Sequence, residues 1–127
     1  MENTREKSVD TKGITTDGVR AIKDALYVVS GKWKLPLLLV LSEGAHRFKD
    51  IYRALDGITP RVLSKELREL EINGLVLRTV TSTIPVSVSY ELTAYSCTLD
   101  GVVRELMNWG NQHRERIIAM RKQYSST

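Results

Sequence analysis

The spacing of apolar residues predicts a mainly helical chain. A first helix is expected over about residues 18–29, with Asp17 as its N-cap. Its apolar residues recur at helical intervals: Ile22, Ala25, Leu26 and Val29. A nearly all-apolar segment over about residues 33–42 predicts a second helix at the centre of the core. The polar residues 1–16 are expected to form a flexible arm, which leaves residues 17–127 as a single domain.

Two short helices joined by a tight turn form the next predicted unit. The first covers about residues 48–55 and has one apolar face: Phe48, Ile51, Tyr52 and Leu55. Gly57 supplies the backbone freedom of the turn. Thr59 is expected to cap the second helix, which begins with Pro60 and runs to about Asn73. This arrangement is typical of a helix-turn-helix, although a plain helical hairpin has the same pattern.

A predicted β-hairpin follows directly and favours the first interpretation. Residues 75–81 are rich in β-formers, and residues 86–92 alternate apolar and polar side chains, as in a strand with one buried face. A hairpin this small must pack against the helices, which makes it a wing. Thr93 is expected to cap a last long helix with an apolar stripe: Leu99, Val102, Val103, Leu106 and Trp109, continued by Ile117 and Met120. The predicted fold class is therefore mainly α with a small β-hairpin wing, a winged helix-turn-helix.

Composition and charge are consistent with one globular, DNA-binding domain. The 127 residues are 42% hydrophobic and 27% charged, so a core can form without disulfides, and Cys97 is the only cysteine. The net charge of +4 includes a basic excess in residues 46–78, which suits a polyanionic partner. The sequence has no apolar segment typical of a secretion signal or a membrane span. We therefore expect a cytoplasmic protein without a membrane partner.

The outer face of the predicted helix over residues 59–73 is polar and basic. It carries Arg61, Ser64, Lys65 and Arg68. In helix-turn-helix docking the first turns of this helix enter the major groove, where Arg reads guanine and Lys and Ser hold phosphates. The alternative is a solvated face in which Lys65 pairs with Glu69 and Arg68 pairs with Glu71. The adjacent wing favours the DNA interpretation.

The sequence contains none of the common catalytic or metal-binding motifs. A phosphate loop, a nucleophile elbow, a CxxC pair and an HExxH segment are all missing. His46, Cys97 and His113 match no known metal spacing, so neither a metal nor a cofactor is expected. Trp33 and Trp109 are expected to pack in the core or at an interface. We therefore expect a double-stranded DNA-binding transcriptional regulator rather than an enzyme, with a winged-helix protein-protein interaction module as the alternative.

Short motifs stand in a fixed order along almost the whole chain. They are SGKWK at residues 30–34, RFKDI at 47–51, GITPRVLS at 57–64, LRELE at 67–71, GLV at 74–76, PVSVSYELT at 85–93 and WG at 109–110. Together they resemble the HxlR family of bacterial winged-helix regulators, which are similar to MarR proteins. The resemblance covers about residues 20–113.

The resemblance implies a homodimer whose first and last helices pack between subunits. The interface residues are then Ile22, Leu26, Leu99, Val102, Val103, Leu106, Trp109, Ile117 and Met120. It also implies two recognition helices in successive major grooves of a pseudo-palindromic operator. The DNA-binding residues that we assign are Lys49, Thr59, Arg61, Ser64, Lys65, Arg68 and Ser87. An unidentified small-molecule effector is a further candidate partner.

This chain departs from the family pattern at three positions. Several relatives sense oxidants through a Cys about ten residues before the GKW segment, where this chain has Arg20. Ser87 stands where the wing usually has Arg, and Ser96 stands where Gly is usual. We therefore expect a weaker grip of the wing on DNA. Cys97 is expected to lie near the surface without a redox role.

Overall fold

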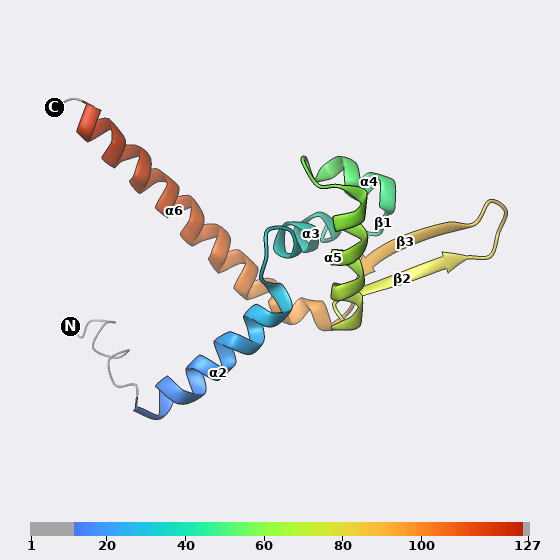
Figure 1. Cartoon of the computed structure of the whole chain (residues 1–127), viewed down its shortest axis with the longest axis horizontal. Coiled ribbons are helices and arrows are strands. Elements are labelled where there is room, and N and C mark those ends of the chain that lie inside the picture. The colour runs from blue at the N-terminus through green and yellow to red at the C-terminus, as the bar shows by residue number, and fades with distance from the viewer. Residues whose placement is uncertain (1–11, 126–127) are drawn as a thin grey trace.

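Two long helices extend away from a body that the shorter elements form (Figure 1). The computed structural model describes residues 12–125. The long helices are α2 (Lys12–Val29) and α6 (Asp100–Ser125). The body contains α3 (Lys34–Leu41), α4 (Phe48–Ala54), α5 (Pro60–Ile72), β1 (His46–Arg47), β2 (Val76–Thr81), β3 (Ser87–Leu92) and the 3-10 helix η1 (Tyr95–Leu99).

The predicted winged helix-turn-helix is confirmed. Helices α4 and α5 are joined by a turn in which Gly57 has a φ of 92°, a conformation that favours glycine. The Thr59 hydroxyl accepts a hydrogen bond from the Val62 N–H at 3.2 Å, and Pro60 occupies the first turn. Strands β2 and β3 form the wing directly after α5.

The bounds of both long helices differ from the prediction. Helix α2 begins at Lys12, so Asp17 lies inside it rather than at its N-cap. Ile14 stands eight residues before Ile22, so the helical spacing already extended further back than we predicted. Of the expected arm over residues 1–16, residues 1–11 lie outside the described part of the chain.

Thr93 does not begin the last long helix, which starts only at Asp100 after η1. The Thr93 hydroxyl accepts a hydrogen bond from the Ser96 N–H at 3.2 Å and donates one to the Gly74 carbonyl at 2.6 Å. It therefore ties the turn before η1 to the loop at the end of α5.

The sheet is antiparallel and has the order β1-β3-β2. The two-residue strand β1, in which His46 lies opposite Tyr90, was not predicted because it is too short for a periodic pattern. Tyr90 and Leu92 pack against the core, as the alternation in β3 predicts. The prediction of a continuous buried face is wrong near the tip, where Val86 is exposed because the hairpin extends beyond the helices (Figure 1).

The core lies within the helix-turn-helix body. Its most deeply buried large side chains are Leu37, Leu41, Ile51, Leu63, Leu67, Leu70 and Leu75. Helix α3 contributes the central face as predicted, although Leu39 on its other side is half exposed. No residue of α6 is buried, and all residues of this helix are among those described. The body is thus held by α3, α4, α5 and the sheet.

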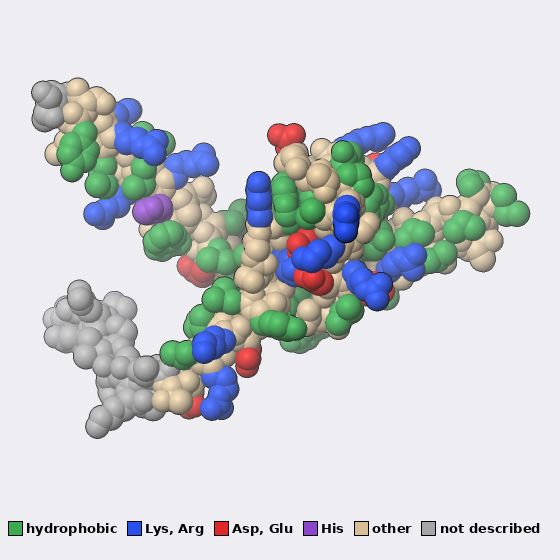
Figure 2. Space-filling model, in the orientation of Figure 1, with side chains coloured by type: hydrophobic (Ala, Val, Ile, Leu, Met, Phe, Trp, Pro, Cys, Tyr) green, Lys and Arg blue, Asp and Glu red, His purple; other side chains and the backbone are tan. Residues whose placement is uncertain are grey.

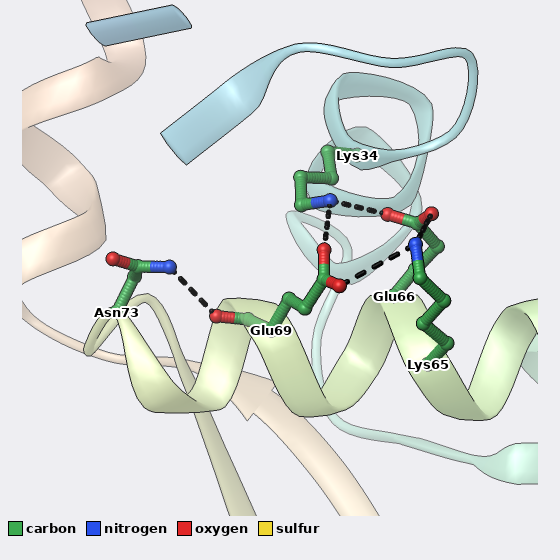
Figure 3. A network of polar contacts seen from close by, with 5 residues as sticks. All are labelled: Lys34, Lys65, Glu66, Glu69 and Asn73. Carbon is green, nitrogen blue, oxygen red and sulfur yellow. Dashed lines mark hydrogen bonds and ion pairs between the residues drawn. The ribbon is translucent and has the colours of Figure 1, made fainter. Parts of the chain in front are cut away.

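An ion-pair cluster joins α3 to α5 beside the core (Figure 3). The Lys34 ammonium donates hydrogen bonds to Oε1 of Glu66 and to Oε1 of Glu69, both at 2.6 Å. Lys65 approaches the second oxygen of each carboxylate, at 3.4 Å from Glu69 and 3.7 Å from Glu66. The cluster thus links α5 to α3, and each buried charge in it has a partner that offsets the cost of its burial.

The cluster shifts two pKa values in directions that keep both groups charged. Burial by itself lowers the pKa of Lys34, but the hydrogen bonds to Glu66 and Glu69 and the charges of these carboxylates outweigh it and raise the pKa above its ordinary value. The hydrogen bond from Lys34 lowers the pKa of Glu69, and the positive charges of Lys34 and Lys65 lower it further. Burial alone would raise this pKa, but its effect is smaller. Both groups are therefore ionised at neutral pH.

Replacing a core side chain of α5 should cost far more stability than replacing an exposed one. Leu70→Ala removes a fully buried side chain and should lower the free energy of unfolding by about 2–5 kcal/mol. Ile72→Ala, two residues further along the same helix, removes an exposed side chain and should cost less than about 1 kcal/mol. Denaturant unfolding of both variants measures the difference, and equal losses would contradict the assigned core.

The stabilisation from Glu69 should disappear in acid. A carboxyl whose pKa is lower in the folded protein stabilises the fold above its unfolded pKa of about 4.3 and loses this effect as the pH falls through its folded pKa. Wild type should therefore be more stable than Glu69→Gln at neutral pH, and this difference in stability should shrink as the pH falls below the unfolded pKa of about 4.3. Denaturant titrations of both proteins across this range test the prediction, which fails if the difference is independent of pH.

Candidate nucleic-acid interface

Helix α5 has a buried face and an exposed basic face. Leu63, Leu67 and Leu70 face the core, while the residues at intervening positions are exposed: Arg61, Ser64, Lys65 and Arg68. The structure thus places these four sequence-predicted residues together on one side of one helix. The backbone N–H groups at the start of α5 add a positive end that favours an anion such as a phosphate.

The four side chains differ in their partners. Lys65 pairs with Glu69, as the solvated-face alternative predicts, and also lies near Glu66. The second pair of that alternative, Arg68 with Glu71, is not formed. Within the described part of the chain, Arg61 and Arg68 form no ion pair. Among the described residues, these two guanidinium groups are therefore the cations of this face without an ion pair, and Lys65 is partly compensated.

The other predicted DNA contacts surround this face. Lys49 is exposed on α4. The next residue, Asp50, forms a loose ion pair with Arg53, in which Oδ1 and Nη1 are 3.9 Å apart. Thr59 is exposed, although its hydroxyl already serves as the cap of α5. Ser87 lies half-buried on β3, where its backbone N–H donates to the Thr81 hydroxyl at 3.2 Å. Figure 2 shows basic side chains spread over this body, with acidic side chains among them.

Two features of the wing were not predicted from the sequence. Arg78 is exposed on β2 and adds a cation to the wing, but a single Arg in a strand gives no periodic signal. Residues 79–90 carry no charge, and Ile84 near the hairpin tip is 97% exposed. Figure 2 shows the apolar side chains that gather at the far end of the wing. The wing therefore has an uncharged tip with exposed apolar side chains, and its one exposed cation on β2, Arg78, lies nearer the body.

The predicted interface residues on the long helices fall into two groups. The exposed group consists of Ile22, Leu26, Val102, Leu106, Trp109 and Met120. Val103 and Ile117 are half-buried, and Leu99 packs against the core of its own chain. Trp109 stacks on His113, with ring centroids 4.9 Å apart. Exposed apolar residues that were not predicted, Val19, Tyr27, Met107 and Ile118, extend the apolar surface of these helices.

The remaining candidate residues have structural surroundings of their own. The His46 ring contacts the Gly44 carbonyl oxygen at 2.7 Å, and Trp33 packs partly against the core with the Lys32 ammonium 5.0 Å from its ring centroid. Cys97 is exposed, as predicted, and lines a groove of about 510 Å³ between α3, η1 and α6. Among the described residues, no cluster of three or more His, Cys, Asp or Glu side chains could hold a metal ion. No described helix is long and apolar enough to cross a membrane.

Comparisons with known proteins identify the family. Residues 28–118 match the HxlR-like helix-turn-helix family. The HTH-type transcriptional regulator YtcD of Bacillus subtilis is 36% identical over 97 residues, which cover 76% of this chain and 77% of YtcD.

Solved structures agree with the sequence comparison. A crystal structure of YtcD superimposes with a TM-score of 0.71, at 36% identity, over 74% of this chain and 96% of that one. The redox regulator HypR in its reduced form superimposes with a TM-score of 0.73, at 35% identity, over 78% of this chain and 98% of that one. These relatives are regulators, in agreement with the prediction that the chain is not an enzyme. The chain belongs to the HxlR-like helix-turn-helix family of transcriptional regulators.

Proposed function

We propose that this protein binds double-stranded DNA sequence-specifically as a homodimer and thereby regulates transcription. The observation that carries the proposal is the exposed face of α5, where Arg61 and Arg68 have no ion-pair partner within the described residues. Arg61 lies in the first turn of α5 and Arg68 in its third, and unpaired guanidinium groups on the exposed face of a recognition helix can read guanine through paired hydrogen bonds. Lys49, Ser64 and Lys65 are assigned to phosphates around this contact.

The dimer part of the proposal rests on the two long helices. Helix α6 extends for 26 residues without burying any of them, and α2 also lies outside the body (Figure 1). Exposed apolar side chains on two such helices form a surface that a monomer leaves in water. A second copy of the chain can cover this surface. In a two-fold symmetric dimer the same residues of both subunits then form the interface. The matching operator is then pseudo-palindromic, with half-sites about one helical turn apart.

A protein-binding winged-helix module is the second candidate. The ion pairs of Lys65 with two carboxylates favour it, because they reduce the positive charge of the face. We prefer DNA because Arg61 and Arg68 form no ion pair within residues 12–125 and because the wing follows directly after their helix. A regulator of this kind acts in the cytoplasm, where bacterial DNA lies. A small-molecule effector stays a prediction. Redox control is not part of the proposed function, because Arg20 stands where several relatives have the sensing thiol.

Removing an arginine of the recognition face should weaken specific binding. Arg61→Ala and Arg68→Ala should each cost about 1–3 kcal/mol of binding free energy and relax base preference at one position of each half-site. Arg114→Ala removes an exposed cation of α6 and serves as the control, with little expected effect. Fluorescence anisotropy with a duplex selected from random-sequence DNA measures all three. Full affinity and specificity in both arginine variants would refute the assigned face.

A charge in the apolar stripe of α6 should break the dimer. Leu106→Glu places a carboxylate among exposed apolar residues that are expected to face the partner, so it should yield monomers. Asn108→Glu adds the same charge on the opposite side of the helix from Leu106 and should leave the dimer intact. Sedimentation at micromolar concentration compares them with wild type. A monomeric wild type, or a dimeric Leu106→Glu protein, speaks against the proposed interface.

A further inference from the structure

We propose that Lys34 is a positioning residue for DNA recognition, which neutralises Glu66 and Glu69 so that Lys65 can leave these carboxylates for a DNA phosphate. Lys34 lies on α3, away from the recognition face, and would act only through its partners on α5. The inference rests on the proposed DNA-binding function and deepens it by assigning a role to a residue that does not touch DNA.

The geometry divides the two lysines into a fixed one and a movable one. The Lys34 side chain is 9% exposed and makes two hydrogen bonds of 2.6 Å, one to each carboxylate. The Lys65 side chain is 63% exposed, and its two ion pairs are longer, at 3.4 Å and 3.7 Å. Figure 3 shows both ammonium groups beside the same pair of carboxylates. Lys34 is therefore the resident counter-ion, and Lys65 is the cation that can be exchanged.

The charges explain why this exchange needs Lys34. With both lysines in place, two positive charges offset two negative ones. When Lys65 turns to a phosphate, Lys34 still compensates one full charge and remains hydrogen-bonded to both carboxylates. Without Lys34, the same movement would leave two carboxylates uncompensated, one of them, Glu66, with a side chain only 11% exposed. An unpaired buried charge is costly, so Lys65 would stay on the protein.

A comparison of salt dependence tests this role. Each phosphate contact contributes about 0.9 to the slope of log K against log[salt], so losing one contact per subunit should flatten the slope of a dimer by about 2. Lys34→Met and Lys65→Met should each produce this flattening, and the double variant should flatten it no further. Anisotropy titrations use a duplex selected by the wild-type protein from random-sequence DNA. A Lys34→Met protein with an unchanged slope, or additive flattening in the double variant, would overturn the inference.

A rescue experiment separates positioning from simple destabilisation. Adding Glu66→Gln and Glu69→Gln to Lys34→Met removes the charges that hold Lys65, so the wild-type slope should return. A purely structural role predicts no return, because the hydrogen bonds from Lys34 are still missing.

Glu69→Gln alone keeps the inference testable if Lys34→Met does not fold. This variant loosens Lys65 and should tighten DNA binding several-fold. Glu71→Gln is the matched control, because Glu71 is an exposed carboxylate of the same helix without an ion pair among the described residues. The advantage of Glu69→Gln over this control should vanish in a Lys65→Met background. Equal effects of the two variants in the wild-type background would refute the exchange of Lys65.

Failure of the inference and failure of the proposed function give different results. If wild-type affinity does not depend on salt, nucleic acid is not the partner and both are lost. If the wild-type slope is steep but Lys65→Met does not flatten it, DNA binding stands and the assigned role of Lys34 falls.

Discussion

The packing of α5 against α3 is the constraint on which the rest of the structure depends. Leu63, Leu67 and Leu70 bury one face of α5 against the core, and Leu37 is the most deeply buried side chain of α3. Because a helix turns once every 3.6 residues, burying this face fixes which residues remain outside. The basic face of α5 is thus a consequence of its packing, and the hairpin that follows is placed beside it by the end of the same helix.

A polar contact between α3 and α5 supplements this apolar one. Lys34 of α3 donates hydrogen bonds to Glu66 and Glu69, two carboxylates of α5. A wholly apolar contact would hold α5 as well. The ion pairs of Lys34 also affect Lys65, because both lysines lie beside the same two carboxylates. A buried residue of α3 thereby influences an exposed residue of α5.

The long helices follow a different rule. Helix α6 has an apolar stripe but buries none of its residues, so its amphipathic pattern is not satisfied within the chain. A free monomer would leave this stripe in water. The body therefore contains the core of the fold, while α2 and α6 carry exposed apolar side chains that the proposed dimer would cover. The proposed DNA contacts therefore lie on the body, and the proposed dimer contacts lie mainly on α2 and α6.

Local patterns in the sequence determined the helix-turn-helix, the wing and the basic face of α5. Strong signals mark them: Thr59 and Pro60 at a helix start, Gly57 in a turn, and alternation in β3. Two later details depended on tertiary context, the two-residue strand β1 and the 3-10 segment before α6, because each is too short for a periodic signal. The pairing of Lys34 with Glu66 and Glu69 was equally hidden, since these residues are 32 and 35 positions apart. Sequence spacing reveals contacts within one helix, whereas only the packing of α3 against α5 brings these charges together.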